Sequence, residues 1–495
     1  MHKLEKIWYS IKCFFFGIPG WFVRLFKSIW TKIKKFGIWI KDDVVDMYNI
    51  FVHGKWQTKV SYLIMGFGSI WRGQVGRGIL FLLFEAVFIL YMCLSGGYWL
   101  SLFDTLGDTP PGTVLDPEYD VWVRVPGDDS FKILFYGLIS IIFILALFYT
   151  WRLNVKQNGI IDKILADGKK IKGTKDDLRS LVDEQFHKTL LALPTLGIFL
   201  FTVVPIIFMV LVAFTSYDGL HTGYNDLFTW VGLDNFNLLF QVNGGSGSFS
   251  VTFGEVLVWT LMWAFFATFT NYFLGMLVAM LINKKGIRLK KLWRTILVLT
   301  IAIPQFVSLL YVSNLFGETG LINETLKSWG WISQPIPFWK DGNWARAMVI
   351  IINIWIGIPY LMLMTSGILM NIPQDLYESA KIDGANVWQQ YTRITLPYVL
   401  FVTGPYLLTS FIGNINNFNV IYLLSGGAPD YTTVGSTAVG KTDLLITWLF
   451  DMTTGADANY KLAAVIGIMI FLVCAVLSLI VYNVMPSTKN EEDYQ

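Results

Sequence analysis

Charged residues, cysteine and histidine are all scarce in this sequence. Of 495 residues, 15% are charged, three are cysteine and four are histidine. A soluble chain of this length needs more charge to cover its surface, and a disulfide framework or Cys/His metal site needs clustered ligands. Cys13, Cys93 and Cys474 lie far apart in the sequence, and the histidines form no cluster. The sequence therefore predicts no bound metal or cofactor, and its 54% hydrophobic residues favour a polytopic membrane protein.

The apolar residues fall into runs that are long enough to cross a bilayer, which takes about 20 residues per helix. We predict an all-α fold with eight membrane-spanning helices. The fifth helix is irregular because it contains Pro304 and Gln305, and the seventh because it carries a run of asparagines. The predicted spans are residues 79–95, 132–151, 190–214, 256–282, 295–315, 347–370, 399–424 and 462–484.

Lysine and arginine are distributed very unevenly between the connecting segments. If the N-terminus is inside, the inner segments hold 31 of them and the outer loops hold 6. Because basic residues concentrate on the cytoplasmic side, both termini are predicted to be cytoplasmic. The predicted inner segments are 1–78, 152–188, 283–294, 371–398 and 485–495, and the outer loops are 96–130, 215–254, 316–346 and 425–461.

Residues 1–78 form a basic, aromatic N-terminal segment that precedes the first span. Tryptophans among lysines predict amphipathic helices on the anionic inner leaflet of the membrane. A flexible basic tail, or a short or re-entrant span within 7–26, is the alternative. The remaining predicted divisions are 79–254 (three spans and their loops), a core of 255–484, and a C-terminal tail of 485–495.

Residues 435–442, GSTAVGKT, match the pattern of a phosphate-binding loop. That motif functions between a buried strand and a helix, and residues 425–434 offer no such strand. The predicted topology also places the loop outside the cell. We therefore expect a flexible outer loop, and the chain lacks a nucleotide-hydrolysing site of its own.

Other catalytic chemistry is sparse. No nucleophile, histidine and acid occur in a recognisable arrangement, and no basic-aromatic stripe indicates nucleic acid. Glu85 is the one clear acid deep in a predicted span. Acids within membrane helices are often functional, so a proton or ion role and a helix-packing role both stay open. The sequence does not predict an enzyme.

Two neighbouring spans carry polar stripes with helical spacing. Each stripe repeats at i, i+3, i+4 and i+7, which places its members on one helix face. Amides donate and accept hydrogen bonds and so suit hydroxyl groups, while an aromatic ring packs against a sugar ring. The same residue types also hold membrane helices together, so a lined cavity and helix packing are the two interpretations. The stripes are Asn353, Ile356, Gly357 and Tyr360 in the sixth span, and Ser410, Gly413, Asn414 and Asn417 in the seventh.

The inner segment between these spans is charged and helix-prone. Residues 372–383 predict a helix that begins near Pro373, and Gly384 interrupts it. Residues 386–395 predict a second, amphipathic helix that Pro397 ends. The pair would form a compact cytoplasmic element attached to the sixth and seventh spans.

The spacing within this segment resembles the EAA loop of permease subunits of binding-protein-dependent ABC importers. The one departure is a serine where the middle alanine usually stands. In that family the loop is a coupling helix that docks into the ATPase subunit, and about five core spans would cover roughly 255–484. The resemblance implies ATPase contact through Glu378 and Ala380 and a bend at Gly384. The matching positions are Glu378, Ser379, Ala380, Gly384, Ile394, Leu396 and Pro397.

The polar stripes extend the resemblance to the larger membrane subunit of maltose/maltodextrin importers. NIWIGIPY (353–360) and SFIGNINNF (410–418) are similar to its sugar-contacting segments, which implies that the eight stripe residues contact sugar. Gly413 stands where that family has phenylalanine, so one aromatic contact is lost. The outer loop 215–254 is too short for the folded periplasmic domain of the Gram-negative form.

The resemblance implies a permease for oligosaccharides, with maltodextrin-like sugars first, in the plasma membrane of a Gram-positive bacterium. The expected partners are a second homologous permease, two ATPase subunits that bind ATP-Mg, an extracellular sugar-binding lipoprotein, the oligosaccharide and membrane lipid. A permease for another polar solute, such as a polyol or glycerol-phosphate, is the alternative. An ion-coupled carrier that uses Glu85 is a further one, although it gives the coupling loop no task.

Overall fold

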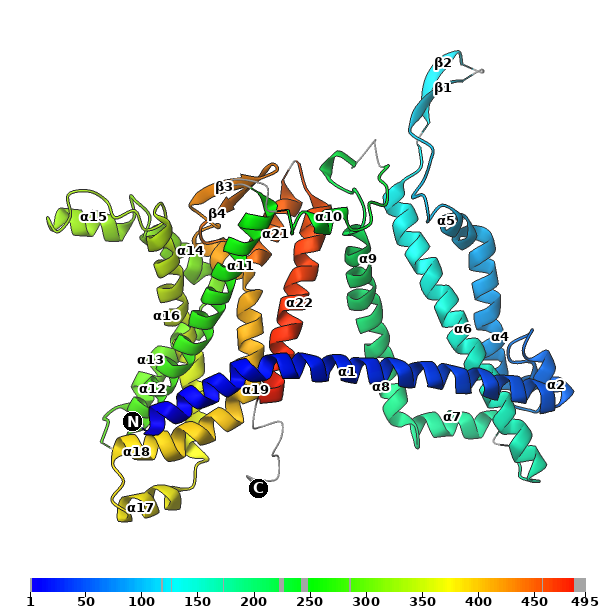
Figure 1. Cartoon of the computed structure of the whole chain (residues 1–495), viewed down its shortest axis with the longest axis horizontal. Coiled ribbons are helices and arrows are strands. Elements are labelled where there is room, and N and C mark those ends of the chain that lie inside the picture. Colours follow the sequence, from blue (N-terminus) through cyan, green and yellow to red (C-terminus); the bar gives the residue numbers. More distant parts are fainter. Residues whose placement is uncertain are drawn as a thin grey trace. The chain divides into compact units, whose positions relative to one another are not determined.

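The computed structural model is mostly helical (Figure 1). Apolar segments become helices because every backbone N–H and C=O inside a bilayer must find a partner within its own segment. The chain separates into two compact units, residues 1–107 with 129–205 and residues 108–128 with 206–495. The predicted tail, 485–495, lies outside the described residues. The described residues are 2–116, 119–125, 127–171, 173–221, 227–241, 248–284, 286–455 and 457–484.

The first unit contains the N-terminal helix and the first membrane spans. A single long helix, α1, covers residues 2–40, the part of the N-terminal segment over which we expected amphipathic helices. The elements of this unit are α1 (His2–His53), α2 (Trp56–Val60), α3 (Phe67–Trp71), α4 (Val75–Tyr91), η1 (Met92–Gly96), α5 (Gly97–Ser101), α6 (Ser130–Ala166), α7 (Thr174–Val182), α8 (Phe186–Ile198) and η2 (Phe199–Val203).

An ion cluster fastens α1 to α6. The Asp43 carboxylate accepts hydrogen bonds from Arg152, at 2.6 and 2.7 Å, and pairs with Lys156. The Arg152 guanidinium also lies 4.9 Å from the centre of the Trp39 ring. The bond from Arg152 lowers the pKa of Asp43 to about 2, so this carboxylate is charged at any physiological pH. The interfacial position of the segment stays a prediction.

The second unit contains the predicted core and the β1–β2 and β3–β4 hairpins. Its elements are β1 (Gly112–Asp116), β2 (Val121–Val125), α9 (Val204–Val212), η3 (Gly219–His221), α10 (Asp234–Asn237), α11 (Phe249–Phe265), η4 (Phe266–Thr270), α12 (Asn271–Asn283), α13 (Lys290–Ala302), α14 (Gln305–Leu315), α15 (Leu321–Ser328), α16 (Gly342–Met370), α17 (Gln374–Ile382), α18 (Val387–Gln390), η5 (Tyr391–Thr395), α19 (Leu396–Ile415), α20 (Phe418–Leu424), β3 (Asp430–Val434), β4 (Thr437–Gly440), α21 (Leu445–Thr454) and α22 (Tyr460–Val484).

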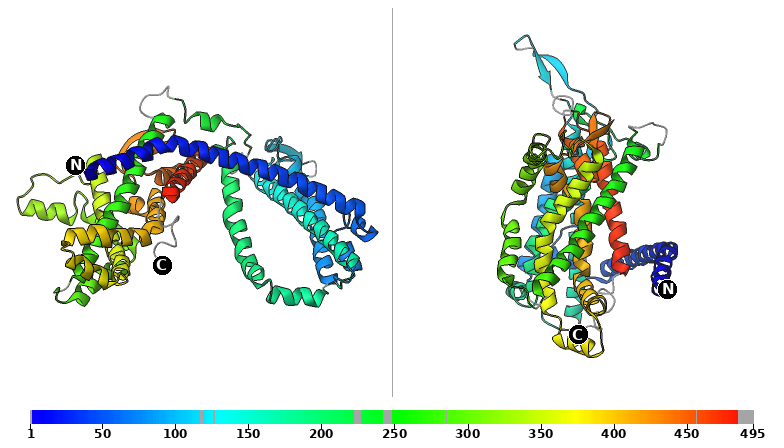
Figure 2. Two further views of the ribbon diagram at one scale, coloured as in Figure 1. Left: turned by 60° about the horizontal axis from the view of Figure 1, so that its bottom comes forward. Right: turned by 90° about the vertical axis from the view of Figure 1, so that its left-hand side faces the viewer.

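Small residues let the central helices of this unit pack closely. A Cβ at Gly275 would lie 2.5 Å from the Leu361 Cβ, so α12 and α16 approach at a distance that only glycine permits. Buried aromatic and aliphatic side chains, among them Trp263 and Trp448, fill the space between the other helices. Figure 2 shows the helices of this unit running side by side. They form a scaffold that holds α16 and α19 in place.

Seven continuous helices are long and apolar enough to span a membrane among the described residues. The predicted fifth span is a pair, α13 and α14, bent by 91° between Ala302 and Gln305. Pro304 disfavours a helical conformation in the residue before it, which explains the break. Lys290 of α13 bonds to Asn283 at the end of α12, and Ser313 of α14 bonds to Leu424 at the end of α20. The pair therefore connects opposite ends of the core, as a broken span does, and the predicted helical membrane fold is confirmed.

The prediction for the seventh span and the helix before it was wrong in its boundaries. Residues 387–415 form one continuous helix, so the expected helix at 386–395 does not end at Pro397. A π-turn, η5, precedes this proline, and its wider winding accommodates a residue that lacks an N–H and clashes with the preceding turn. The helix then ends at Ile415, and residues 418–424 form the separate α20.

The GSTAVGKT segment is an ordered hairpin and not the flexible loop that we expected. Strand β3 pairs antiparallel with β4, and Gly435 turns between them with a φ of 62°. The Lys441 amine lies 3.6 Å from the centre of the Tyr431 ring, and Thr442 is fully buried. These residues pack against their neighbours, so this segment does not form a glycine-rich phosphate-binding loop.

Candidate functional site

The two predicted polar stripes lie on α16 and α19, which both belong to the second unit. Asn353 is buried, Ile356 and Gly357 are half-buried, and Tyr360 is exposed. On α19, Gly413 is exposed, and Ser410 and Asn414 are half-buried. Asn417 is also half-buried, but it lies beyond the end of α19 and caps α20, so the predicted helical stripe does not extend to it. The structure therefore separates a packed end of the α16 stripe from an open face that continues onto α19.

Packing dominates the buried end of the α16 stripe. A Cβ at Gly357 would lie 2.4 Å from the Asn271 amide nitrogen, so this glycine accommodates the Asn271 side chain. The same amide donates to the carbonyl of Ala267, at 2.8 Å, and more weakly to that of Asn353, at 3.4 Å. Asn271 was missed in the sequence because it follows η4, whose wider turn interrupts the 3.6-residue spacing.

A chain of hydrogen bonds orders the amides of Asn414 on α19 and Asn417 at the start of α20. The Asn414 side chain donates to the Thr268 hydroxyl at 2.9 Å, and its oxygen accepts from the Asn417 amide at 3.2 Å. The Asn417 oxygen accepts in turn from the backbone N–H of Val420 and so caps α20. The Trp263 indole donates to the Asn414 carbonyl at 3.1 Å. These bonds fix the direction in which the amides point.

Two tyrosines face each other further along α16 and α19. The ring centres of Tyr360 and Tyr406 are 6.2 Å apart, and the rings are tilted by 39°. Tyr406 was missed in the sequence, although it precedes Ser410 by four residues and so extends the α19 stripe by one turn. Nothing lies within 4 Å of where a Gly413 Cβ would stand. The face thus combines two aromatic rings, several amides and an open position.

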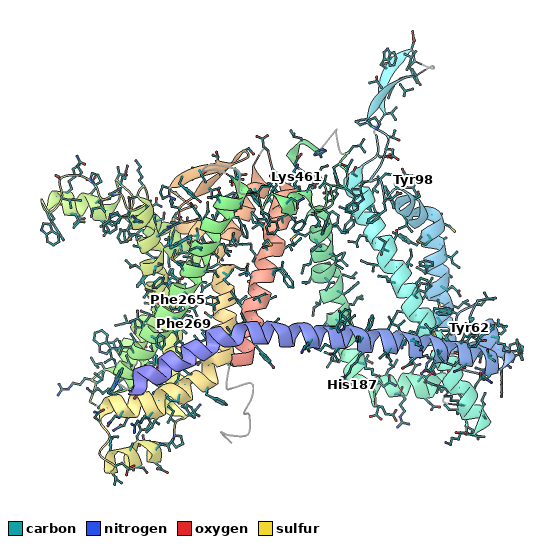
Figure 3. The ribbon with its side chains drawn as sticks, in the orientation of Figure 1. Tyr62, Tyr98, His187, Phe265, Phe269 and Lys461 are labelled. Carbon is teal, nitrogen blue, oxygen red and sulfur yellow. The ribbon has the colours of Figure 1, made fainter. Side chains whose placement is uncertain are left out.

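Aromatic residues also lie along the span that consists of α11, η4 and α12 and packs against α19. Phe265 and Phe269 lie one turn apart with ring centres 4.9 Å apart, and Figure 3 labels both. The Phe269 ring lies 6.2 Å from that of Phe411 on α19. These rings support the α11–α12 span where it meets the polar face.

The predicted coupling segment consists of α17, a turn and the start of the long helix from Val387. Gly384 has a φ of 79°, a left-handed conformation that favours glycine. Asn386 and Gln389 exchange side chain to backbone hydrogen bonds and so begin the next helix. The Tyr377 hydroxyl lies 2.8 Å from that of Thr395, which ties α17 to this helix.

The residues that the resemblance assigns to ATPase contact divide between exposed and packed positions. Glu378, Ser379, Gly384 and Pro397 are exposed, whereas Ala380, Ile394 and Leu396 are half-buried. Ile394 and Leu396 pack with Tyr377 and Ile372 in one apolar cluster, so they fix the element to its span. Figure 1 shows α17 at the opposite end of this unit from β3 and β4.

Aspartates line a polar cavity of about 340 Å³ beneath the β3–β4 hairpin. Burial raises the pKa of Asp443 to about 7, although its carboxylate accepts from the Gly440 N–H and the Thr447 hydroxyl. Burial, with the charge of Asp430, also raises the pKa of Asp451 to about 6. No cluster of ligands suited to a metal ion occurs among the residues that the structure describes.

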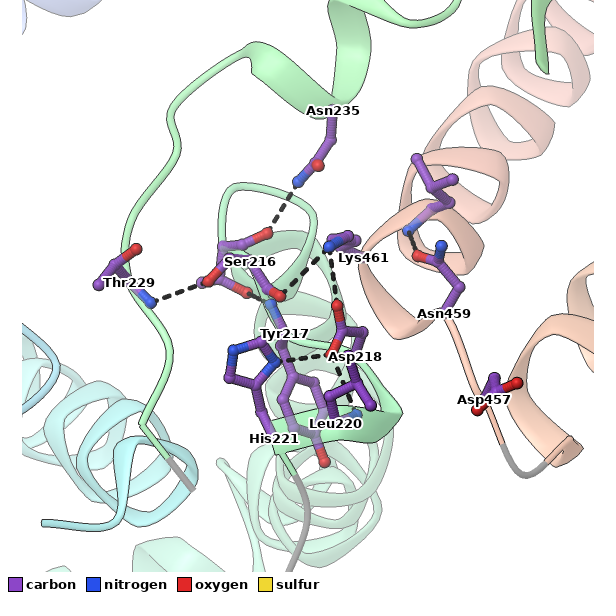
Figure 4. A network of polar contacts seen from close by, with 12 residues as sticks. Ser216, Tyr217, Asp218, Leu220, His221, Thr229, Asn235, Asp457, Asn459 and Lys461 are labelled. Carbon is purple, nitrogen blue, oxygen red and sulfur yellow. Dashed lines mark hydrogen bonds and ion pairs between the residues drawn. The ribbon is translucent and has the colours of Figure 1, made fainter. Parts of the chain in front are cut away.

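A second polar network joins the end of α9 to the start of α22 (Figure 4). Asp218 accepts from the Lys461 amine at 2.9 Å and lies 2.7 Å from a His221 ring nitrogen. Although burial opposes it, these two bonds lower the pKa of Asp218. The rings of Tyr217 and Tyr460 stack at 4.8 Å beside them. The network fastens the segment that follows α9 to the start of α22.

Glu85 has a structural partner in the first unit. Its carboxylate accepts the backbone N–H of Met65 at 2.8 Å, in the segment that leads into α3. Arg72 nearby in sequence pairs with Asp162 of α6 at 2.6 Å. Holding a backbone turn satisfies the acid, which supports the helix-packing interpretation over an ion pathway.

Comparison with known proteins adds independent information. A family model described as "Binding-protein-dependent transport system inner membrane component" matches residues 271–490. The maltodextrin transport system permease protein MalC of Streptococcus pneumoniae is 33% identical over 431 residues, which are 85% of this chain and 94% of that protein.

Two further relatives are similar to this chain over different lengths. The galactooligosaccharides transport system permease protein GanP of Bacillus subtilis is 35% identical over 436 residues, 87% of this chain and 97% of that protein. The maltose/maltodextrin transport system permease protein MalF of Klebsiella aerogenes is 35% identical over 267 residues, 53% of this chain and 50% of that protein. The family match covers α12 to α22, and so includes both polar stripes and the coupling segment.

Proposed function

Since this chain belongs to the family of binding-protein-dependent transport system inner membrane components, we propose that it forms the sugar pathway of an ATP-driven oligosaccharide importer. It is a transport subunit and performs no covalent chemistry. The observation that carries the proposal is the set of polar and aromatic residues Tyr360, Tyr406, Asn414 and Asn417, in a chain that spans almost all of two sugar permeases.

The chemistry of this face suits a neutral, hydroxyl-rich solute. Amides both donate and accept, and tyrosine rings offer an apolar surface to the C–H face of a sugar ring. None of the eight predicted contacts is charged, so a phosphorylated solute would find no cation among them. These features favour an oligosaccharide, maltodextrin-like in the first instance, over glycerol-phosphate.

We propose that Asn353, Tyr360, Ser410, Gly413, Asn414 and Asn417 contact the sugar, with Ile356 and Gly357 completing the α16 stripe. Gly357 would act through Asn271, whose amide it accommodates. ATP-driven closure of two partner ATPases would move α17 and, through the continuous helix that begins at Val387, the amides of α19. A second permease subunit would supply the other wall of the pathway.

The proposed location is the plasma membrane of a Gram-positive bacterium. Streptococcus and Bacillus relatives match along most of their length, and the outer loop 215–254 leaves no room for a large folded domain. An extracellular binding protein held by a lipid anchor would then deliver the sugar. The binding-protein dependence of the family supports this partner.

A reconstituted complex tests the substrate. The permease pair and ATPases are placed in nanodiscs, and ATPase stimulation by loaded binding protein is measured with maltodextrins, galacto-oligosaccharides, polyols and glycerol-phosphate. We expect stimulation by one class of neutral oligosaccharide. Stimulation by a phosphorylated solute alone would overturn the proposal.

Substitutions at Asn414 and at Thr268 distinguish sugar binding from helix packing, because a change of either residue removes the hydrogen bond between them. Asn414→Leu and Thr268→Val both break that bond. If Asn414 contacts sugar, Asn414→Leu lowers uptake at least about tenfold, an effect of about 1.4 kcal/mol, while Thr268→Val retains most activity. Equal losses in both variants, with equal loss of assembly on gel filtration, would leave only the packing role.

A further inference from the structure

The first outer loop carries a β-hairpin whose apolar side chains are uncovered. Strands β1 and β2 pair antiparallel, with Val114 opposite Val123 and Leu115 opposite Trp122 (Figure 1). One face presents four valines that are between 44% and 58% exposed, and the other presents Trp122, which is 67% exposed. The four valines are Val114, Val121, Val123 and Val125.

The base of the hairpin is firmly closed. The Asp128 carboxylate accepts the backbone N–H groups of Asp108 and Thr109, both at 3.0 Å, and its own N–H donates to the Thr109 carbonyl at 2.8 Å. A Cβ at Gly127 would lie 2.4 Å from that carbonyl, so glycine permits the closure. These bonds define the hairpin as a distinct element rather than as a flexible connection.

A two-stranded hairpin with apolar residues on both faces is marginally stable by itself. Within the described part of the chain, β1 and β2 pair only with each other, so both outer edges are also unpaired. Proteins normally cover or protect such edges and patches, because they otherwise promote aggregation. The hairpin therefore has the properties of a surface that a partner covers.

The net charge of the hairpin segment favours a protein over lipid as the partner that covers it. Residues 108–128 contain five acidic residues and one arginine, a net charge of −4. Anionic lipid headgroups would repel this segment, whereas a protein with a basic rim around an apolar patch would attract it. The loop also belongs to the segments that are poor in lysine and arginine, which places it outside the cell.

We propose that the β1–β2 hairpin is a docking arm for the extracellular solute-binding protein, which would present an apolar patch with basic residues around it. This inference rests on the proposed function, since it requires an importer that receives its substrate from such a protein. Docking by exposed valines and a tryptophan would bury the apolar surface, and the aspartates would speed and orient the encounter.

The test uses the reconstituted complex and the binding protein whose addition stimulates its ATPase activity. Val114→Thr with Val123→Thr keeps the β-branched shape of this cross-strand pair and removes part of its apolar surface. We expect the binding-protein concentration for half-maximal stimulation to rise at least about tenfold, with maximal activity unchanged. Val182→Thr, at an exposed valine of a predicted inner segment, should leave this concentration unchanged.

The acidic residues are tested separately. Asp116→Asn with Asp120→Asn removes two charges, and asparagine tolerates the left-handed backbone at position 120, where φ is 51°. We expect weaker stimulation at low salt and a smaller dependence on salt concentration. Wild-type behaviour of both double variants would overturn the docking arm.

An environment-sensitive dye identifies the covering surface. With the native cysteines replaced, Tyr119→Cys is labelled near the hairpin tip in the assembled complex. A blue shift only after the binding protein is added supports the proposal, and a blue shift in nanodiscs alone indicates lipid and overturns it. If no binding protein stimulates the wild-type complex with any sugar, the proposed function fails, which is a separate outcome.

Discussion

At the scale of single residues, small and polar residues of this protein serve either in helix packing or on the half-buried polar face, and some serve in both. Gly357 accommodates an amide of the neighbouring helix, whereas Gly413 leaves space open. Asn414 bonds to a neighbouring helix and also lies on a half-buried face. Both glycines belong to polar stripes with the same helical spacing, so only their surroundings distinguish packing from a lined pathway.

Gly413 should set the size of the sugar that the pathway accepts. Gly413→Phe places a ring in the open space and is expected to reduce uptake of long oligosaccharides more than that of disaccharides, by about tenfold in their ratio. Gly413→Ala, which adds a single methyl group, should preserve the ratio. Competition uptake assays measure it, and an unchanged ratio in Gly413→Phe would place the sugar elsewhere.

Asp443 should make stability depend on pH. Its pKa is raised from the ordinary 3.8 to about 7, so between these values the folded chain holds a proton that the unfolded chain lacks. Stability then falls as the pH rises from about 4 to 7 and levels off above 7. Asp451, with a pKa of about 6, adds to the same trend.

The thermal unfolding midpoint of the complex at pH 5 and pH 8 measures this effect. Each kcal/mol corresponds to about 2–4 °C in a domain of 150–250 residues, and we expect wild type to lose at least that much at pH 8. Asp443→Asn should reduce the difference, whereas Asp167→Asn, at an exposed position, should retain it. An identical pH difference in all three proteins would contradict the assignment.

At the scale of elements, irregularities in the helices position the functional parts. The π-turn η5 carries the helix past Pro397, so that the second half of the predicted coupling segment and Asn414 of α19 lie on one continuous helix. Another π-turn, η4, brings Thr268 and Asn271 toward the stripes. Continuous winding at 3.6 residues per turn would have separated these groups.

Glu378 tests the coupling element. Glu378→Lys reverses a charge on exposed α17 and is expected to lower ATP-dependent uptake at least about tenfold, because the ATPase contact is lost while the chain stays inserted. Asp167→Lys makes the same charge change in another predicted inner segment and should have little effect. Co-purification of the ATPases is the direct measurement, and normal co-purification with normal uptake would exclude docking through Glu378.

At the scale of the whole molecule, the positions of the basic residues predict which side of the membrane each loop faces. The 31-to-6 distribution of basic residues predicts that the β1–β2 hairpin and the β3–β4 hairpin are outside and α17 is inside. Within the second unit, α17 and the β3–β4 hairpin do lie at opposite ends of the helices. The absolute orientation is a prediction from the sequence.

Single cysteines in a background without Cys13, Cys93 and Cys474 test this orientation. An impermeant maleimide applied to intact cells should label Tyr119→Cys and leave Ser379→Cys unlabelled until the membrane is permeabilised. Labelling both in intact cells would indicate a leaky membrane, and a permeant reagent is the control. The reversed pattern would invert the topology.

Much of this architecture follows from the sequence because membrane insertion depends on local properties. A run of apolar residues must form a helix wherever it enters lipid, and the residues around Gly384 predicted a helix, a turn and a second helix, which the structure contains. Helix ends were harder to predict. A proline normally interrupts a helix, whereas Pro397 lies within one.

The sequence by itself determined the membrane class, the helical spans and the helix faces that carry polar residues, because each depends on composition and on periods of a few residues. Only the tertiary structure decided that GSTAVGKT is a packed hairpin, that Asn271 and Tyr406 join the polar stripes and that Glu85 holds a backbone turn. These outcomes depend on partners far away in the chain, and no local pattern encodes which helix will lie opposite.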